Sequence, residues 1–430
     1  MRMRRRLGRY GEACSVYVAA VVAGLAIMAP VDLEQAARSR SAHLDILAND
    51  TVHAAAVGVL IAVVVAIVAT VHGSVRVGWG IAVCGTVILL ADHLAAGSAP
   101  APHELLALMY SDAGGGGLVL GGLAGAVVMH SAPAAALTTG ALTTAVIGNR
   151  TSLADRAADR AQPADRWEWH LLDSPPRWLV LIALILVLAT GIANRRARHR
   201  RWVGVFPFAS ACGGLLVVAT AMLGWDWLAA GGSSLPRAVA AGGLIIAGVT
   251  AAAFLLPGLD GAIALLATAF TVVWGELAPV RLPVADLIVL PILIAVGYFA
   301  GLRRRSALLG WTALVTVAVA VACSGQLRHT AMVAVVPVLG AAVGYAWAAS
   351  TPIRKSSRAV TIPLLFTPSI VLGFRQHLRA ADGIADAPDW AAVVLVLSCF
   401  LGFGALRAVR KGRRCAIGAG RFRCGGGTFG

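Results

Sequence analysis

The stretch RWLVLIALILVLATGIANRRARHRR, residues 177–201, joins an apolar run to the densest basic cluster of the chain. A helix needs about 20 mostly apolar residues to cross the hydrocarbon of a bilayer, and residues 177–194 come close to that length. Arg residues gather on the cytoplasmic side of membrane proteins. The stretch therefore predicts a transmembrane helix that ends in the cytoplasm.

The same kind of apolar run recurs along the whole chain. The sequence is 59% hydrophobic and only 13% charged, with a mean hydropathy of +0.81, which excludes an ordinary water-soluble domain. The composition and the runs predict an all-α, polytopic integral membrane protein. We expect about fourteen spans, at residues 14–30, 53–71, 77–97, 113–130, 133–148, 177–194, 203–223, 237–257, 259–275, 283–302, 306–323, 331–350, 359–374 and 390–406.

The basic residues indicate the orientation. Most of them follow even-numbered spans or lie in the two tails, at 2–9, 76, 195–201, 303–305, 354–358 and 407–423, whereas most acidic residues fall in the opposite loops. This bias predicts that both termini are cytoplasmic. The abundance of Arg, Ala, Val and Gly, with Lys355 and Lys411 as the only lysines, favours a bacterial inner membrane. The net charge of +16 then predicts contact with anionic lipid headgroups rather than with nucleic acid.

Tryptophan and cysteine add two expectations. All 11 Trp residues lie near predicted span ends, where the indole ring favours the headgroup level. The seven Cys residues show neither a disulfide framework nor the spacing of a zinc site. We therefore expect no metal and no cofactor.

The loops divide the chain into a six, two and six arrangement. We predict a first six-helix bundle at residues 1–194, two inserted helices at 195–258, a second bundle at 259–407, and a disordered, basic, Gly-rich cytoplasmic tail at 408–430. The predicted outer loop at 149–176 contains Ser152-Leu-Ala-Asp155, a pattern that resembles a capping box and predicts a short surface helix.

Several short motifs resemble those of a known family. Val75-Arg76-Val77-Gly78-Trp79 follows the second span, Gly140 and Gly148 lie in or at the end of the fifth, and residues 283–305 combine Asp286 and Pro291 with a basic turn. With the span order, these features resemble the major facilitator superfamily, in particular its fourteen-span drug/proton antiporter-like branch. The resemblance implies two six-helix bundles that work by alternating access.

The motifs also depart from the family pattern. The acid and the second Arg that the family has beside Arg76 and Gly78 are missing, and so is its first-span acid. Tyr110 stands where the family has an Arg four residues before Gly114, and Thr144 and Asn149 replace members of the fifth-span motif. These losses concern the coupling mechanism rather than the fold.

Few ionisable residues lie inside the predicted spans, and burying such a group is costly unless it has a partner or a function. Asp92 and His93 lie in the outer part of the third span, and Asp286 lies just inside the outer end of the tenth. Each is a candidate for substrate or proton coupling, or else an interfacial group or a local pair. The glycines at 114–117, 121, 122 and 125 form either a close-packing face or a hinge or substrate-lining face.

Three classes of function are open at this point. The first is secondary transport or export of an apolar or amphipathic small molecule or lipid. The second is a polyprenyl-phosphate-dependent membrane glycosyltransferase, with Asp32 and Glu34 as an acid pair. The third is a non-transporting membrane scaffold derived from a transporter fold. The absence of Lys and Arg from the middle of the spans argues against a strongly anionic substrate. Transport of an apolar or amphipathic molecule is therefore the main expectation.

Overall fold

The fold is all-helical in the part of the chain that the structure, a computed structural model, describes. That part comprises residues 2–28, 44–95, 102–127, 130–147, 175–196, 208–231, 235–277, 284–323, 329–351, 359, 361–366 and 390–423. Thirteen α-helices and two 3₁₀ helices lie in it, and it contains no strand. The predicted all-α class is therefore confirmed.

The helices follow the predicted spans in order. They are α1 (Arg2–Met28), α3 (Leu44–His72), α4 (Val75–Ala95), α5 (Pro102–Val127), α6 (Ser131–Ile147), α9 (Arg177–Ala193), η4 (Asn194–Arg196), α10 (Phe208–Gly231), α11 (Leu235–Leu255), α12 (Ala262–Leu277), α13 (Val284–Arg303), α14 (Ala307–Cys323), α15 (His329–Ala349), η6 (Pro363–Phe366) and α18 (Trp390–Arg423). Among the described residues, five helices are long and apolar enough to cross a membrane, and six further apolar helices are shorter. This agrees with a multi-pass membrane protein.

Several helices extend well beyond their predicted spans, and α1 is one of them, because it begins at Arg2. α3 begins at Leu44 and α5 at Pro102, and in α5 the residues from Glu104 to Met109 that precede the apolar core are good helix formers. α18 continues to Arg423 through a segment that contains Gly as well as Arg, so the prediction of a disordered tail is wrong up to that residue. In the predicted thirteenth span, the described residues include the short 3₁₀ helix η6 instead of a long α-helix.

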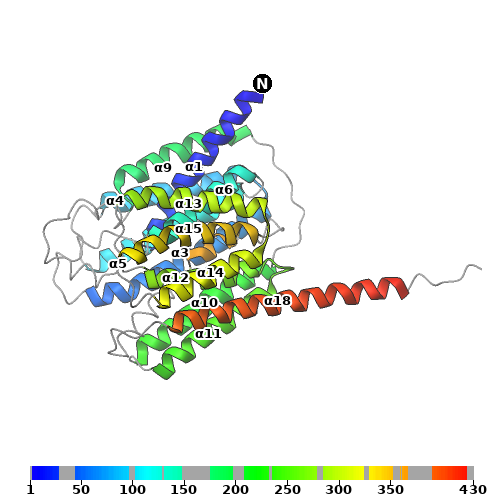
Figure 1. The fold of residues 1–430 in the computed structure, drawn as a ribbon. Helices are drawn as coiled ribbons and strands as arrows, with labels where there is room; N and C mark the ends of the chain where they lie inside the picture. The colour runs from blue at the N-terminus through cyan, green and yellow to red at the C-terminus, as the bar shows by residue number, and fades with distance from the viewer. Residues whose placement is uncertain are drawn as a thin grey trace, which may run out of the picture.

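The first six helices pack in a definite order. α5 packs against α3, α4 and α1, while α1 also packs against α6 and α9, and α4 packs against α9 (Figure 1). The second set repeats this order when α12, α13, α14, α15, the η6 segment and α18 are counted from one to six. α15 packs against α13, α14 and α12, while α18 packs against α12 and α14. The two halves therefore share one packing plan.

Small residues hold equivalent helices together in the two halves. A Cβ atom on Gly117 of α5 would meet the carbonyl oxygen of Gly58 on α3, and a Cβ atom on Gly297 of α13 would meet that of Ala341 on α15. Gly122 likewise lies against Gly78 of α4. Contacts this close require small residues, so the glycines of α5 form a packing face.

A Gly-Trp pair repeats in the third helix of each half. Gly78-Trp79 occupies the fourth and fifth positions of α4, and Gly310-Trp311 occupies the same positions of α14. Each Gly lies against the fourth helix of its half, at Gly122 or at Ala346. The repeat therefore extends from the helix order down to single side chains.

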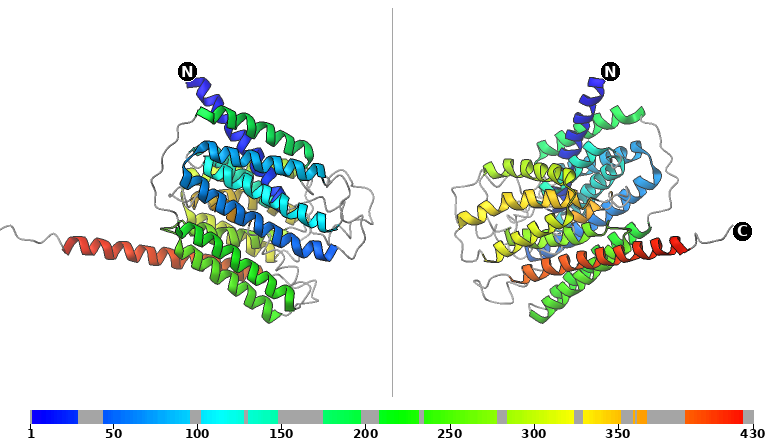
Figure 2. Two further views of the ribbon diagram at one scale, coloured as in Figure 1. Left: turned by 180° about the vertical axis from the view of Figure 1, so that it is seen from behind. Right: turned by 45° about the vertical axis from the view of Figure 1, so that its right-hand side comes forward.

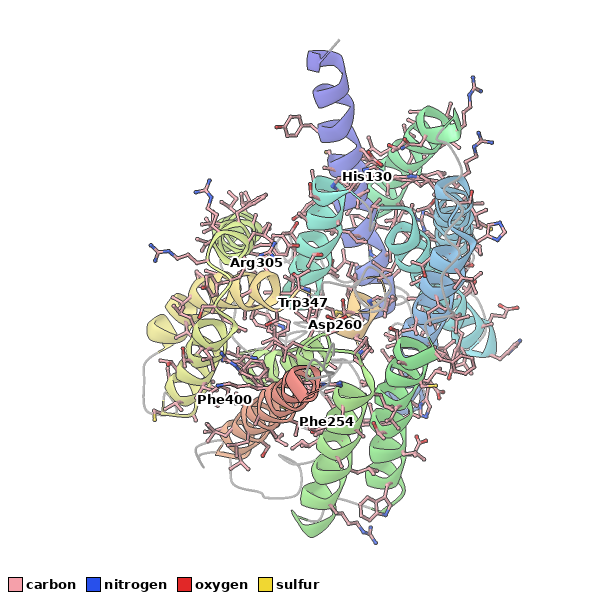
Figure 3. The ribbon with its side chains drawn as sticks, turned by 90° about the vertical axis from the view of Figure 1, so that its right-hand side faces the viewer. His130, Phe254, Asp260, Arg305, Trp347 and Phe400 are labelled. Atoms are coloured by element: carbon pink, nitrogen blue, oxygen red, sulfur yellow. The ribbon has the colours of Figure 1, made fainter. Side chains whose placement is uncertain are left out.

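The buried tryptophans correct the headgroup interpretation. Trp79 lies beside the sixth helix at Gly191, and Trp311 stacks on Phe403 of α18 with ring centroids 5.5 Å apart. Figure 3 shows Phe400, a second neighbour of Trp311, between α18 and the yellow second-half helices. Neighbouring helices cover these rings, so contact with headgroups is wrong for the buried Trp residues at 79, 225, 274, 311 and 347. Trp178 and Trp227 are exposed, as that interpretation requires.

The inserted helices α10 and α11 form a hairpin that contacts both halves. α10 packs against α3, whereas α11 packs against α12 and α18 (Figures 1 and 2). On the α10 side, the imidazole Nε2 of His53 lies 2.9 Å from a carboxylate oxygen of Asp226. On the α11 side, Arg410 of α18 donates hydrogen bonds to the carbonyl oxygens of Phe254 and Leu256, at 2.8 and 2.7 Å. Figure 3 shows Phe254 beneath α18.

We expect Arg410→Ala to destabilise the protein by about 2 kcal/mol, because hydrogen bonds from a charged donor to helix-end carbonyls are stronger than neutral ones. Arg407→Ala, one turn earlier on the same helix and exposed, is the matched control and should change stability by less than about 0.5 kcal/mol. Thermal unfolding in detergent measures both. Equal melting temperatures for the two variants would show that Arg410 does not anchor the hairpin.

Candidate functional site

A buried polar cluster lies between α4 and α5, near the end of α4 that the sequence predicts to face outside. The ring nitrogen Nδ1 of His93 lies 2.8 Å from the carbonyl oxygen of Leu89. A carbonyl can only accept, so Nδ1 carries a proton and donates it to that oxygen. The same nitrogen lies 3.8 Å from a carboxylate oxygen of Asp112 on α5, and the two side chains are only 10% and 3% exposed.

A second acid joins this cluster from α4. The side chain of Asp92 is hydrogen-bonded to Ser111 of α5 and interacts electrostatically with His93. Its other oxygen, Oδ2, is buried and has no hydrogen-bond partner among the described residues. Two carboxylates and one imidazole therefore share a small region between two helices, which is where a proton can bind and be exchanged.

Sequence reasoning found two members of this cluster and missed the third. Asp92 and His93 lie in the outer part of the third span, as predicted, and form a local pair with α5. Asp112 was assigned to an outer loop, and that assignment is wrong because α5 begins at Pro102 and buries the carboxylate at 2% exposure. The helix-forming residues at 104–109 were the signal that placed Asp112 inside a helix.

Asp260 is the other buried acid among the described residues, and it lies at the boundary between the predicted eighth and ninth spans, where a cytoplasmic turn is expected. It does lie in the turn between α11 and α12, but its side chain is buried rather than solvated. Figure 3 shows Asp260 near the centre of the bundle in that view. No Lys or Arg is buried in the part of the chain that the structure describes.

The other predicted site residues do not join the polar cluster. Arg76 is exposed at the second position of α4. Gly78 packs on Gly122 as described above, and Gly140 of α6 lies against the backbone of Tyr17 on α1. Asp286 is the third residue of α13, but its side chain lies outside the described part of the structure, and so do Gly148, Asp32, Glu34 and residues 152–155.

The region where the two halves contact each other, called the seam below, contains the 3₁₀ helix η6. It occupies the fifth place of the second half, yet it packs against α1, α3, α5 and α6 of the first half as well as against α12. All four of its residues are buried. Short 3₁₀ segments are often found at functional hinges, and transporter sites are commonly built from interrupted helices.

Phe366 fills the space between α1 and α6 at this seam. A Cβ atom on Gly24 would lie 2.7 Å from the Phe366 ring and 2.7 Å from the methyl group of Thr144. The Thr144 hydroxyl lies 3.0 Å from the carbonyl oxygen of Gly140 in its own helix and 3.2 Å from that of Val21 on α1, and the Tyr17 hydroxyl donates to Thr143. The aromatic ring of one half therefore packs against small and hydroxyl-bearing residues of the other half.

Metal chemistry finds no support within the described ranges. No group of three or more His, Cys, Asp or Glu side chains there has the arrangement of a metal site. The described cysteines, Cys14, Cys84, Cys212, Cys323 and Cys399, are free thiols.

Comparisons with known proteins give little further guidance. No protein-family model matches the sequence, and no curated protein matches it either. Among solved structures, the fold is similar to the xylose transporter XylE from E. coli in a partially occluded inward-open conformation. The sequences are 9% identical, the match covers 92% of this chain and 96% of that chain, and the TM-score is 0.49.

Proposed function

We propose that the protein is a secondary transporter that works by alternating access between its two six-helix halves. The observation that carries this proposal is the shared packing plan of the halves together with the way they meet. α6 of the first half contacts α13 of the second, and α3 of the first half contacts η6 of the second. Each contact therefore joins the fifth helix of one half to the second helix of the other. A pair of symmetric contacts of this kind suits the rocking of one half against the other.

The substrate we propose is an apolar or amphipathic small molecule or lipid. The seam residues Gly24, Thr144 and Phe366 are apolar, or small with a single hydroxyl group. A phosphate or a carboxylate at this depth would favour a cationic partner, and the buried side chains described here include no Lys or Arg. An uncharged substrate with a large apolar surface fits such walls better.

The remaining sequence predictions form part of the same proposal. The order of the helices supports two bundles, at 1–194 and 259–407, with inserted helices at 195–258. It also supports kinship with the fourteen-span branch of the major facilitator superfamily. We place the protein in a bacterial inner membrane with both termini cytoplasmic. Its basic turns would then contact anionic headgroups.

A pair of distance measurements tests alternating access without knowledge of the substrate. Spin labels at Leu94→Cys and the natural Cys323 report on the α4 and α14 ends predicted to lie outside. Labels at His72→Cys and Arg305→Cys report on the opposite ends, and all four positions are exposed. The other reactive cysteines are replaced by Ser, whereas the buried Cys399 stays. Double electron–electron resonance is then recorded on the full chain in lipid nanodiscs.

Alternating access predicts two distances for each pair, with the outer pair long when the inner pair is short. A scaffold predicts one fixed distance for each pair under all conditions, which would contradict transport. The glycosyltransferase alternative depends on Asp32 and Glu34 and predicts no such coupled change in distance.

A further inference from the structure

We propose that the inserted hairpin, α10 and α11, is an arm of the second half that latches onto the first half at the outer side. His53 of α3 and Asp226 of α10 form the latch, and they hold the arm in place while the outer side is closed. This inference rests on the proposed alternating access and deepens it, because it names a contact that regulates the opening of the outer side.

The inner end of the arm is fixed to the second half. Only the compact turn at residues 256–261 separates α11 from α12, and the side chain of Asp260 in this turn is buried. A Cβ atom on Gly261 would meet the backbone of Ala253 on α11, so the turn packs directly against that helix. Arg410 of α18 adds the two hydrogen bonds to the end of α11 described above. The arm therefore moves with the second half at this end.

The two helices of the arm pack tightly against each other. A Cβ atom on Gly248 of α11 would meet the side chain of Thr220 on α10, and one on Gly224 of α10 would lie 3.2 Å from the side chain of Ile245 on α11. Small residues allow helices to approach this closely, and close packing transmits movement from one helix to the next. α10 therefore follows α11, and the whole arm belongs to the second half.

The outer end of the arm contacts the first half through a hydrogen bond. Nε2 of His53 lies 2.9 Å from a carboxylate oxygen of Asp226, and because an ionised carboxylate only accepts, the nitrogen donates. The side chains are 28% and 55% exposed. His53 begins the predicted second span and Asp226 follows the predicted seventh, so both lie toward the predicted outer side. Figure 3 shows the green helices of the hairpin beside α18 and below the blue helices of the first half.

The position of this hydrogen bond decides which state it stabilises. α3 belongs to the first half and α10 to the arm of the second, so opening of the outer side moves α3 away from α10 and breaks the bond. A contact present in one state and absent from the other shifts the equilibrium toward the state that has it. The His53–Asp226 bond therefore favours the state in which the outer side is closed.

The outer label pair tests the latch in the full chain in lipid nanodiscs. Loss of the hydrogen bond should raise the ratio of long to short outer distances by about threefold to fivefold, since a charged hydrogen bond that is partly exposed has modest strength. We expect this rise in His53→Ala and in Asp226→Ala, and the double variant should show no further rise because both changes remove one contact. Trp227→Ala, next to Asp226 and exposed, is the matched control and should change the ratio by less than about twofold.

A second label pair reports on the latch itself and keeps the test valid if the alanine variants do not fold. Val57→Cys on α3 and Trp227→Cys on α10 replace exposed residues one turn from His53 and next to Asp226, and line broadening in continuous-wave EPR measures short distances between the labels. The latch predicts that these labels move apart in the same fraction of molecules in which the outer distance is long.

The two measurements separate failure of the latch from failure of the proposed function. A single distance between positions 57 and 227 beside two outer distances, or an unchanged outer ratio in His53→Ala and Asp226→Ala, would overturn the latch and leave alternating access standing. A single outer distance in every preparation would instead overturn the proposed function.

Discussion

Replacing Gly78 by Leu is expected to destabilise the protein by about 3 kcal/mol, or to prevent folding, because an overpacked contact in a dense interior forces the backbones apart. A Cβ atom at this position would lie 2.7 Å from the carbonyl oxygen of Gly122 and 3.0 Å from the amide nitrogen of Ala126. Both neighbours are backbone atoms of α5, which cannot rotate away as a side chain would. α4 and α5 must therefore separate.

Gly80→Leu is a control on the same helix. Gly80 is exposed, and a Cβ atom there would meet nothing within 4 Å. Leu also forms helices better than Gly by nearly 1 kcal/mol, so this variant should fold at least as well as wild type. Yield and melting temperature after size-exclusion chromatography in detergent compare the two. If Gly78→Leu and Gly80→Leu behaved alike, the close α4–α5 contact would be refuted.

Trp311→Ala is the second large effect, with an expected cost of about 3 to 5 kcal/mol. The ring is fully buried between α14 and α18, where it stacks on Phe403 with an interplanar angle of 21° and contacts Phe400. Truncation would leave a cavity in the second half. Unfolding with increasing SDS measures the loss through the midpoint of the transition.

Trp178→Ala controls for the loss of an indole ring as such. Trp178 lies at the start of α9 and is 55% exposed, so we expect a change of about 0.5 kcal/mol or less. A Trp311→Ala variant as stable as Trp178→Ala would show that Trp311 contacts lipid, as the sequence had suggested, and not the sixth helix.

Hydropathy predicted the helices well because membrane spans are long and apolar, so their existence can be read from local sequence. Thirteen of the expected spans coincide with α-helices of the structure, whereas the thirteenth in order holds η6. A 3₁₀ segment depends on what surrounds it. Residues 363–366 are packed by four helices of the other half, and no local pattern reports that contact.

The sequence revealed only part of the candidate site, for a related reason. Asp92 and His93 stood out as ionisable residues inside an apolar run. Asp112 did not, because a hydropathy window discards the amphiphilic first turns of α5 in which it lies. Its pairing with His93 is a tertiary contact at 3.8 Å, which no local sequence pattern reports. The interpretation of Trp79 and Trp311 failed in the same way, since neighbouring helices and not headgroups cover both rings.

The most direct test of alternating access is made in the wild-type background at one pH. It asks whether the outer distance is long when the inner distance is short. Leu94→Cys with Cys323 reports on one end of the bundle, and His72→Cys with Arg305→Cys reports on the other. Rocking of the halves predicts two distances for each pair, with the fraction of long outer distances equal to the fraction of short inner ones. One narrow distance for each pair, or outer and inner distances that lengthen together, would contradict it.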